Sequence, residues 1–468
     1  MKLIKDTFKG TFSALSKQLS YNEIIEFLDA NWSDMPEAKQ SERITQLDQA
    51  LQSPSKKIHT IFFTGTNGKS LTMYFATKLL QEEGVTVGSF SAPHILTYNE
   101  RLSINGVTIS NKDFTELANE VLNVASSKKL QPSSFELLSL IALLYFANNN
   151  VNVALLEVTE PYAKLFTICY PKIAAITRVV PEKPDDTQRE IDKTLEIIQP
   201  NTYVISADQS KLNLQLMLSI TKEKGGKWIM PIRKLAPLNY PFEQLYGRCA
   251  ALAERVTHLY VNKIAQKDAI IVTESLLTKP KARRGRPTLE AQRTSEINPQ
   301  KTLQQFWKED HGTLPARFQI LDKEKPTVML DTADNVDAFK NLLLGIRLLH
   351  YQRPLKGLSI VLGLNSVEIN MEELLKHLRY FFKKTSGQVF VCPTNAKPGQ
   401  PGNKACDVQE VTHQLKSMKI KAVITQDFKT AFKQACDAVD NRHGLIVVTG
   451  STSIITDYWR EHKGIKKL

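Results

Sequence analysis

The sequence predicts a mixed α/β protein whose main sheet is mostly parallel and doubly wound, and three observations support this prediction. Short apolar runs alternate with longer segments of helical periodicity, as at 58–63 and 71–80. A glycine-bearing turn joins these two segments, as expected where a buried strand leads into a helix. A second alternation of the same kind begins near residue 327, so we expect a second, smaller α/β domain.

The N-terminal half supplies the elements of the first sheet. Gly84 is typical of the end of a helix, and Asn105-Gly106 is typical of the turn of a β-hairpin. Apolar runs predict strands, and apolar residues spaced three or four apart predict helices. The predicted strands are 58–63, 85–90, 151–158, 173–179 and 203–206, and the predicted helices are 21–28, 71–80, 114–126 and 135–148.

The C-terminal part repeats this rhythm over about 150 residues, a size typical of one domain. Its predicted strands are 327–330, 358–362, 388–392, 422–424 and 445–449, and its predicted helices are 338–349, 371–382 and 428–439. We therefore divide the chain into a domain at 1–278, a basic linker or insertion at 279–313, and a domain at 314–468.

Composition excludes several classes of protein. The chain has 468 residues, of which 42% are hydrophobic and 23% charged, and no apolar run approaches the roughly 20 residues of a membrane span. Its first residues lack the apolar core of a secretory signal. The five cysteines are dispersed, without the close pairs of a metal site, which favours reduced thiols and a cytoplasmic protein.

The net charge of +13 raises the question of nucleic-acid binding. Part of the charge is concentrated at 279–287, where Arg284-Gly-Arg-Pro287 is similar to the core of a motif that lies in the minor groove of DNA. A single copy without interleaved aromatic residues favours a solvated insertion instead. A basic cleft for polyanionic small substrates would also account for positive charge, so we do not expect nucleic acid as a partner.

The turn after the first predicted strand carries the clearest functional signal. It reads Gly65-Thr66-Asn67-Gly68-Lys69-Ser70, and a helix follows it. Glycines let backbone amides close around phosphate oxygens, the helix N-terminus and Lys69 add positive charge, and a serine hydroxyl can bind Mg²⁺. An ordinary strand-to-helix turn could also contain glycine and lysine, but the order, spacing and flanking pattern together favour a nucleoside triphosphate site.

Four stretches resemble the folylpolyglutamate synthase/dihydrofolate synthase family, within the Mur ligase superfamily. The phosphate loop is one, and Glu157 lies in another, Asn152-Val-Ala-Leu-Leu-Glu-Val158. The most specific is Ala92-Pro-His-Ile followed by Asn99-Glu-Arg-Leu-Ser-Ile-Asn-Gly106. The C-terminal part contributes Leu314-Pro-Ala-Arg-Phe318, Leu330 to Asn335, and Val448-Thr-Gly-Ser451.

This resemblance implies a Mur-ligase-type nucleotide-binding domain, a Rossmann-like C-terminal domain, and ATP-dependent amide formation. In the family's reaction, a substrate carboxylate becomes an acyl phosphate that an amino acid, typically glutamate, attacks. The resemblance implies ATP and Mg²⁺ as cofactors, folate or pteroate and glutamate as substrates, and Lys69 and Glu157 as catalytic residues. His94 is a further catalytic candidate, although its position in the family motif favours a role in ordering the loop. The resemblance further implies that Ser70 and Glu157 bind the metal, and that Arg317, Asp331 and Asn335 bind the nucleotide together with the loop.

The sequence departs from the family pattern at several positions that carry chemistry. Ala92 replaces a metal-binding serine, although Ser91 is adjacent, and the strand exit at 176–186 lacks the expected Asp-His pair. The segment after Val158 contains no glycine, and Gly247 and Asp334 replace a nucleotide-contacting asparagine and a histidine. Lys193 is a candidate for a displaced catalytic lysine, and Glu160, Asp185 and Asp186 are spare carboxylates.

Three functions therefore stay open at this point. The first is a folate-type ligase with rebuilt metal ligands, and the second is a nucleotide-binding homologue without catalytic activity. The third is a ligase for an unrelated substrate. In each case we expect a monomer that binds small molecules and has no membrane partner.

Overall fold

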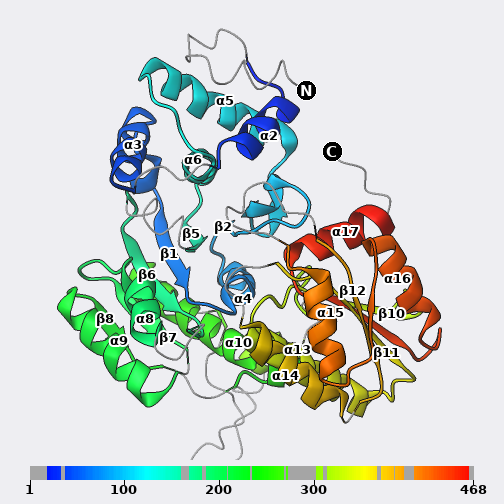
Figure 1. Cartoon of the computed structure of the whole chain (residues 1–468). Helices are drawn as coiled ribbons and strands as arrows, with labels where there is room; N and C mark the ends of the chain where they lie inside the picture. The colour runs from blue at the N-terminus through cyan, green and yellow to red at the C-terminus, as the bar shows by residue number, and fades with distance from the viewer. Residues whose placement is uncertain are drawn as a thin grey trace, which may run out of the picture.

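The computed structural model describes residues 18–32, 37–159, 168–181, 186–207, 209–231, 235–267, 270–271, 302–308, 314–365, 370–383, 385–394 and 405–462. Two sheets with their covering helices lie side by side in Figure 1, one built from the N-terminal part of the chain and one from the C-terminal part. We call these the first and the second domain.

The first domain is built on an eight-stranded sheet with the order β4-β3-β2-β5-β1-β6-β7-β8. The six strands from β2 to β8 in this order are parallel, whereas β3 and β4 form an antiparallel hairpin at one edge. Asn105 and Gly106 make the predicted hairpin turn. The strands are β1 (His59–Thr64), β2 (Val87–Phe90), β3 (Leu102–Ile104), β4 (Val107–Thr108), β5 (Val153–Glu157), β6 (Pro171–Ile176), β7 (Tyr203–Ser206) and β8 (Lys227–Ile229).

Helices cover both faces of this sheet, and the alternation of side chains along each strand divides the core in two. Phe62 and Leu156 pack with α2, α3, α5, α6 and α8, whereas Ile61, Phe63 and Leu155 pack with α4 and α10 on the opposite face. The helices are α2 (Tyr21–Ala30), α3 (Glu37–Ala50), α4 (Lys69–Glu82), α5 (Asn111–Ser127), α6 (Ser134–Asn148), α8 (Thr187–Leu195), α9 (Lys211–Glu223) and α10 (Phe242–Leu259).

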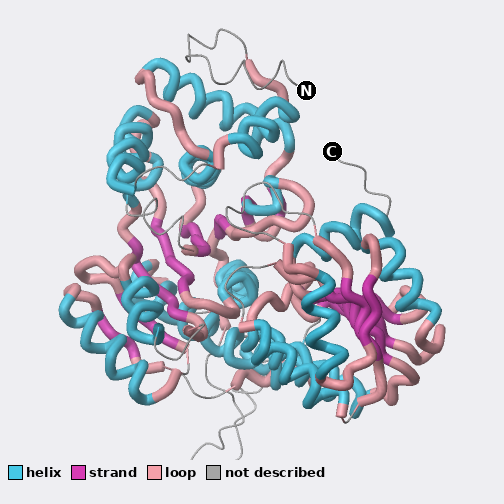
Figure 2. The backbone as a smooth tube through the Cα atoms, in the orientation of Figure 1, coloured by secondary structure: helices cyan, strands magenta, loops and turns pink. Residues whose placement is uncertain are grey.

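Local sequence explains where several of these helices begin. Ser20 and Ser133 each form a capping box, in which the serine hydroxyl accepts from the backbone of a glutamate that in turn accepts from the serine. Glu136 of the second box is fully buried and also binds Arg43 of α3 at 2.6 Å, so it ties α3 to α6. Figure 2 shows these helices gathered above the first sheet.

The second domain is built on a six-stranded sheet with the order β13-β12-β11-β14-β10-β9. Five strands are parallel, and β9 pairs antiparallel with β10 at one edge. The strands are β9 (Gln319–Leu321), β10 (Thr327–Asp331), β11 (Leu358–Leu362), β12 (Gln388–Val391), β13 (Ala422–Ile424) and β14 (Leu445–Thr449).

Helices on both faces complete the second domain. The first set, α13 (Val336–Gln352), α14 (Met371–Phe382) and α15 (Val408–Ser417), packs against one face with residues such as Met329 and Ile360. The second set, α16 (Phe428–Asp437) and α17 (Thr452–His462), packs against the other with Val328 and Val361. Both sheets are thus doubly wound, which confirms the predicted fold class.

The prediction of an exposed linker does not hold for residues 303–308, which lie within the predicted segment at 279–313. Residues Leu303–Lys308 form a short helix, α12, and Leu303, Phe306 and Trp307 are buried in the core of the first domain against α4. The polar composition of the surrounding sequence predicted an exposed segment. Burial of the two aromatic rings stabilises this short helix against the first domain in spite of its polar neighbours. The residues 279–293, which carry the basic motif, lie outside the described residues, so the proposed boundaries at 278 and 314 stay predictions.

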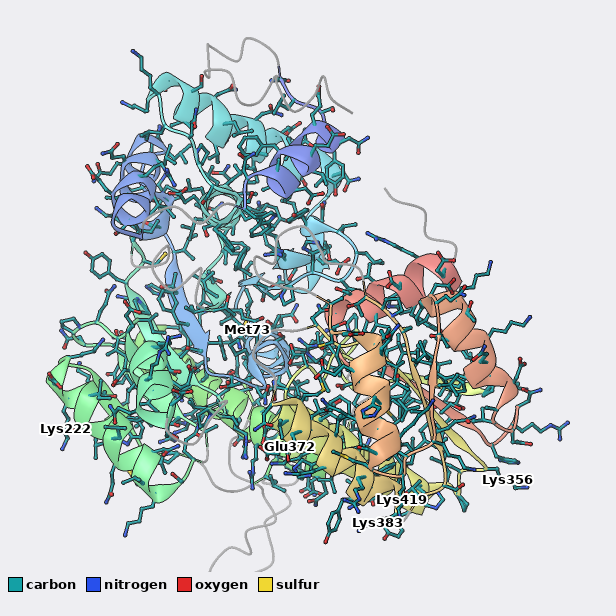
Figure 3. The ribbon with its side chains drawn as sticks, in the orientation of Figure 1. Met73, Lys222, Lys356, Glu372, Lys383 and Lys419 are labelled. Atoms are coloured by element: carbon teal, nitrogen blue, oxygen red, sulfur yellow. The ribbon has the colours of Figure 1, made fainter. Side chains whose placement is uncertain are left out.

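The labelled lysines of Figure 3 lie at the periphery of both domains, on separate elements, whereas Met73 of α4 is buried between them. Lys222, Lys356 and Lys419 are all exposed. Positive charge is thus spread over the described surface. None of the helices that the structure describes is long and apolar enough to cross a membrane.

Candidate nucleotide-binding site

The loop between β1 and α4 has the backbone of a phosphate cradle. Gly65 and Gly68 have φ angles of +117° and +92°, which side chains rarely adopt. A Cβ at Gly65 would lie 2.5 Å from the Thr177 hydroxyl, and one at Gly68 would lie 2.9 Å from the sulfur of Cys249. Only glycine fits at both positions, and the N-terminus of α4, which begins at Lys69, receives no side-chain cap.

Lys69 folds back onto the loop that it follows. Its Nζ donates to the carbonyl oxygens of Gly65 at 2.8 Å and Thr66 at 3.1 Å. Burial lowers the pKa of Lys69, while the nearby carboxylates of Glu157 and Asp334 act in the opposite direction. An ammonium group held only by carbonyl oxygens in a cavity is well placed to exchange them for phosphate oxygens.

Ser70 and Glu157 meet at the carboxyl edge of the first sheet. The Ser70 hydroxyl donates to Oε2 of Glu157 at 2.9 Å, and the backbone N–H of Ala92 approaches the same oxygen at 3.4 Å. Strand β5 places Glu157 beside the end of β1, because the two strands are parallel neighbours. The sequence placed these residues in one metal site, and the structure brings them together.

These two oxygen-bearing side chains fit Mg²⁺, which is usually held by one or two carboxylates together with substrate phosphates and water. Among the described residues no group of three or more histidine, cysteine or acidic side chains could hold a metal by itself. Ala92 supplies no side-chain oxygen, and Arg178 brings a positive charge to the exit of β6. The donor set therefore fits one ion that shares its coordination with a nucleotide.

The three nucleotide-binding residues predicted in the second domain face the same cavity as the loop. Arg317, Asp331 and Asn335 line it together with Lys69 and Ser70. The cavity has a volume of about 660 Å³, is open to solvent, and lies between the two domains. This is within the usual range for a small-molecule site.

Asp331 lies at the end of β10 and accepts hydrogen bonds from the backbone of Phe318 at 2.7 Å and Ala333 at 2.8 Å. Burial nevertheless raises the pKa of Asp331 to about 6, against the opposing effect of these bonds and of Arg317. Asn335 caps α13 by accepting from the N–H of Ala338 at 3.0 Å. The carboxyl edge of the second sheet thus presents titratable and polar groups to the phosphate loop.

His94 lies elsewhere. It is not among the residues that line the cavity, and its Nδ1 accepts a hydrogen bond of 3.0 Å from Nε of Arg101. Its ring packs against Tyr98, which also stacks with Trp32. Glu100 accepts three backbone N–H groups, those of Ile95, Leu96 and Thr97. This geometry does not support the predicted catalytic role of His94 and favours a role in ordering the loop at 91–101.

Two of the spare groups considered from the sequence, Lys193 and Asp186, do not line the cavity. Lys193 lies on α8, within 4.0 Å of Glu190, and it does not line the cavity. Asp186 precedes the same helix, and Glu160 and Asp185 lie outside the described residues. The glycine-free segment after Val158 also falls almost entirely outside them. The displaced lysine thus gains no support from its position.

Sequence reasoning missed several residues that line the cavity. Arg178 and Asp337 form an ion pair of 2.9 Å across the boundary between the domains, and Lys340 pairs with Glu373 at 3.1 Å. Tyr246 of α10 is partly buried and donates to the carbonyl of Arg317 at 2.8 Å. Arg178 could have been found from its position beyond a parallel strand, next to the loop. The partners on α13 and α10 had no comparable signal, because their proximity depends on how the domains pack.

Sequence comparison finds no matching family model but does find curated relatives. The chain is 43% identical to the dihydrofolate synthase/folylpolyglutamate synthase of Bacillus subtilis over 109 residues, 22% of this chain and 25% of that protein. It is 26% identical over 314 residues to a probable bifunctional folylpolyglutamate synthase/dihydropteroate synthase of Haloferax volcanii, 64% of this chain and 35% of that protein. The chain thus matches about a quarter to a third of the length of these relatives.

Solved structures resemble the whole fold. Folylpolyglutamate synthase of Mycobacterium tuberculosis complexed with ADP has a TM-score of 0.74 at 19% identity, covering 96% of this chain and 99% of that one. Folylpolyglutamate synthase of Thermotoga maritima has a TM-score of 0.67 at 21% identity, with 96% and 98% covered. The bifunctional synthase of Yersinia pestis complexed with AMPPNP and Mn has a TM-score of 0.69 at 18% identity, with 97% and 99% covered. At these identities the likeness shows a shared fold.

Proposed function

We propose that this chain is a member of the folylpolyglutamate synthase/dihydrofolate synthase family. We further propose that it is an ATP-dependent ligase that joins glutamate to a pteroate or folate carboxylate through an acyl phosphate. The single observation that carries the proposal is the cavity between the domains. It places the loop at 65–70 and the Ser70–Glu157 pair opposite Arg317, Asp331 and Asn335.

The residues that line this cavity suit a triphosphate. Four cations, Lys69, Arg178, Arg317 and Lys340, line it beside five carboxylates, and Arg178 and Lys340 are paired with two of these. Lys69 and the partial positive charge of the N-terminus of α4 lie at the loop itself, where the phosphates would bind. The left-handed glycines allow the backbone to approach the phosphates closely. Two relatives of the same fold bind ADP, or AMPPNP with Mn, which agrees with a nucleotide and a divalent cation at this site.

Ser70 and Glu157 would hold Mg²⁺ in this proposal. When bound, the ion neutralises charge that develops on the transferring phosphoryl group. Lys69 would exchange its two loop carbonyls for phosphate oxygens and so orient the terminal phosphate toward the carboxylate acceptor. Closure of the second domain over the bound substrates would exclude water from an acyl phosphate that water would hydrolyse.

The carboxylate and amine substrates are assigned from the relatives. The bifunctional synthase whose structure contains Mn, AMPPNP and L-glutamate resembles this chain with a TM-score of 0.70 at 19% identity. Glutamate is therefore the first amine to test. Pteroates and reduced folates are the first carboxylates.

A non-catalytic nucleotide-binding protein is the alternative that a specific observation favours. Ala92 offers no oxygen to a metal, and the ion pair of Arg178 with Asp337 puts a guanidinium group near the phosphate loop. These features reduce the number of metal ligands without removing the phosphate cradle. The family fold would then serve regulation or assembly.

Phosphate release measured with ATP, Mg²⁺, L-glutamate and a panel of pteroates and folates separates the two functions. A ligase releases phosphate only when both the carboxylate and the amine are present, because the amine discharges the acyl phosphate. ATP binding by calorimetry without phosphate release from any folate-type substrate would overturn the ligase proposal and favour the alternative. A ligase for an unrelated carboxylate would show release only after the panel is widened.

A further inference from the structure

Four side chains join the phosphate loop to the second domain, and we call them the interdomain clasp: Asn67, Arg178, Asn335 and Asp337. Asp337 lies in the first turn of α13, and its side chain is 14% exposed. Its Oδ1 accepts from Nε of Arg178 at 2.9 Å, and its Oδ2 accepts from Nδ2 of Asn67 at 3.0 Å. Both oxygens of one carboxylate are therefore used by two residues of the other domain.

In the first domain, Arg178 is hydrogen-bonded to the backbone of the phosphate loop. The backbone N–H groups of Thr66 and Asn67 donate to the carbonyl oxygen of Arg178 at 2.8 and 3.2 Å. Any displacement of Arg178 is thus transmitted to the loop. Asn67 and Asn335 add a reciprocal pair of amide hydrogen bonds at 2.9 and 3.1 Å.

We propose that Asp337 is a positioning residue that clasps Asn67 and Arg178, and that it thereby couples nucleotide affinity to closure of the second domain. The nucleotide part of this inference rests on the proposed function, whereas the closure part does not. The clasp contains no group that must react. Asp337 lines the cavity, and in this proposal its effect on the ligand comes from the loop it holds.

Other hydrogen bonds between the two domains limit how far loss of the clasp can open them. The hydroxyl of Tyr246 donates to the carbonyl of Arg317 at 2.8 Å, and that of Thr456 donates to the carbonyl of Ile95 at 2.7 Å. These contacts remain when the clasp is removed, so opening is partial. For a ligand that contacts both domains, the apparent Kd equals the Kd of the closed form divided by the fraction of molecules that are closed. A fall of this fraction to about one fifth therefore raises the apparent Kd about fivefold.

The test combines calorimetry with ADP and small-angle X-ray scattering of the ligand-free full chain. Asp337→Ala and Arg178→Ala should each raise the Kd for ADP about fivefold and increase the radius of gyration. The double variant should lose less affinity than the sum of the two single variants, because the contact between Asp337 and Arg178 is removed in all three. Asp337→Asn, which keeps one acceptor for Arg178, should bind with intermediate affinity.

A matched control is the ion pair of Arg353 with Asp322, 2.6 Å long and formed within the second domain. Asp322→Ala removes a charge pair without touching the boundary, so it should change neither the affinity nor the radius. An unchanged radius in both clasp variants overturns the closure part even if no nucleotide binds at all. Unchanged ADP affinity, or additive losses in the double variant, overturns the coupling, and thermal unfolding confirms that each variant is folded.

Discussion

The hydroxyl of Ser70 and the carboxylate of Glu157, which are 87 positions apart in the chain, meet at 2.9 Å at the edge of the first sheet. Lys69, one position before Ser70, donates to two carbonyl oxygens of the loop. The fold thus brings the hydroxyl, the carboxylate and the ammonium group to one end of the first sheet.

Replacing Lys69 by alanine should weaken ATP binding by about 1.5–3 kcal/mol, since it removes a charge-assisted contact with phosphate. Calorimetry of both proteins with ATP measures the difference. Lys222→Ala, on the outer helix α9, is the control and should bind as the parent does. Equal affinity of Lys69→Ala and the parent would mean that the loop is vestigial.

Glu157→Gln should abolish ligase activity and divalent-cation binding while it leaves the fold intact. Glutamine keeps the size of the side chain and one oxygen that can accept from Ser70, but it removes the charge that attracts the ion. Binding of Mn²⁺ with ADP, followed by electron paramagnetic resonance, reports the loss independently of activity. Glu190→Gln on α8 should leave it unchanged, and undiminished Mn²⁺ binding in Glu157→Gln would exclude this carboxylate as a ligand.

Asp331 should make the free energy of unfolding depend on pH. Its pKa is raised from 3.8 to about 6, so between these values the folded protein binds more protons than the unfolded chain. The free energy of unfolding, measured relative to Asp331→Ala, should therefore fall as pH rises from 4 to 7. We expect a fall of about 2 kcal/mol, less than the full pKa difference would give, because the open cavity partly solvates the carboxyl group. Urea unfolding of both proteins at several pH values tests this, and a difference that does not vary with pH would refute the shift.

Arg43 should be important for stability rather than function. Its partner Glu136 is fully buried, so Arg43→Met would leave a buried carboxylate held only by Ser133. Loss of a buried ionic partner typically costs about 3–5 kcal/mol, and the serine contacts favour the lower end of this range. Chemical denaturation measures the cost, with the exposed Lys112→Met as control. A loss below about 1 kcal/mol would show that Ser133 alone satisfies the carboxylate.

Deleting residues 279–293 should leave both the fold and ATP binding unchanged. The described residues on either side of the wider segment, Ile271 and Leu303, are buried in the same core. Electrophoretic mobility with duplex DNA at low and high salt tests the opposite hypothesis. Salt-sensitive DNA binding that disappears on deletion would favour a nucleic-acid role for the basic motif.

Patterns within single segments could be predicted from the sequence, and arrangements between distant segments could not. The strands at 203–206 and 358–362 are found at the predicted residues, because their apolar character reflects burial in a parallel sheet. Glu157 and Ser70 were paired because the resemblance to the ligase family implies that both bind one metal, and the common edge of the parallel strands brings them together. Helix α10 and the short α12 were missed, since their apolar residues are interrupted by polar ones.

The contacts of Arg178 and Asn67 with α13 depend on how two domains pack, which no local pattern encodes. The same limit applies to His94. Its place in the motif left both a chemical role and a role in ordering the loop open, and the contacts of Glu100 with three backbone N–H groups and of Tyr98 with the His94 ring agree with the second. A motif thus marks a residue as a candidate for a role, and the contacts of its side chain indicate which role the residue has.

The buried position of Trp307 determines which breaks in the chain the molecule can survive. Its ring meets Phe75 of α4 with centroids 5.4 Å apart, so residues 303–308 belong to the first domain although they follow the basic motif. A nick between 272 and 301 therefore does not separate the two domains. Two fragments produced there would share one hydrophobic core, and we expect them to purify as a single complementing complex.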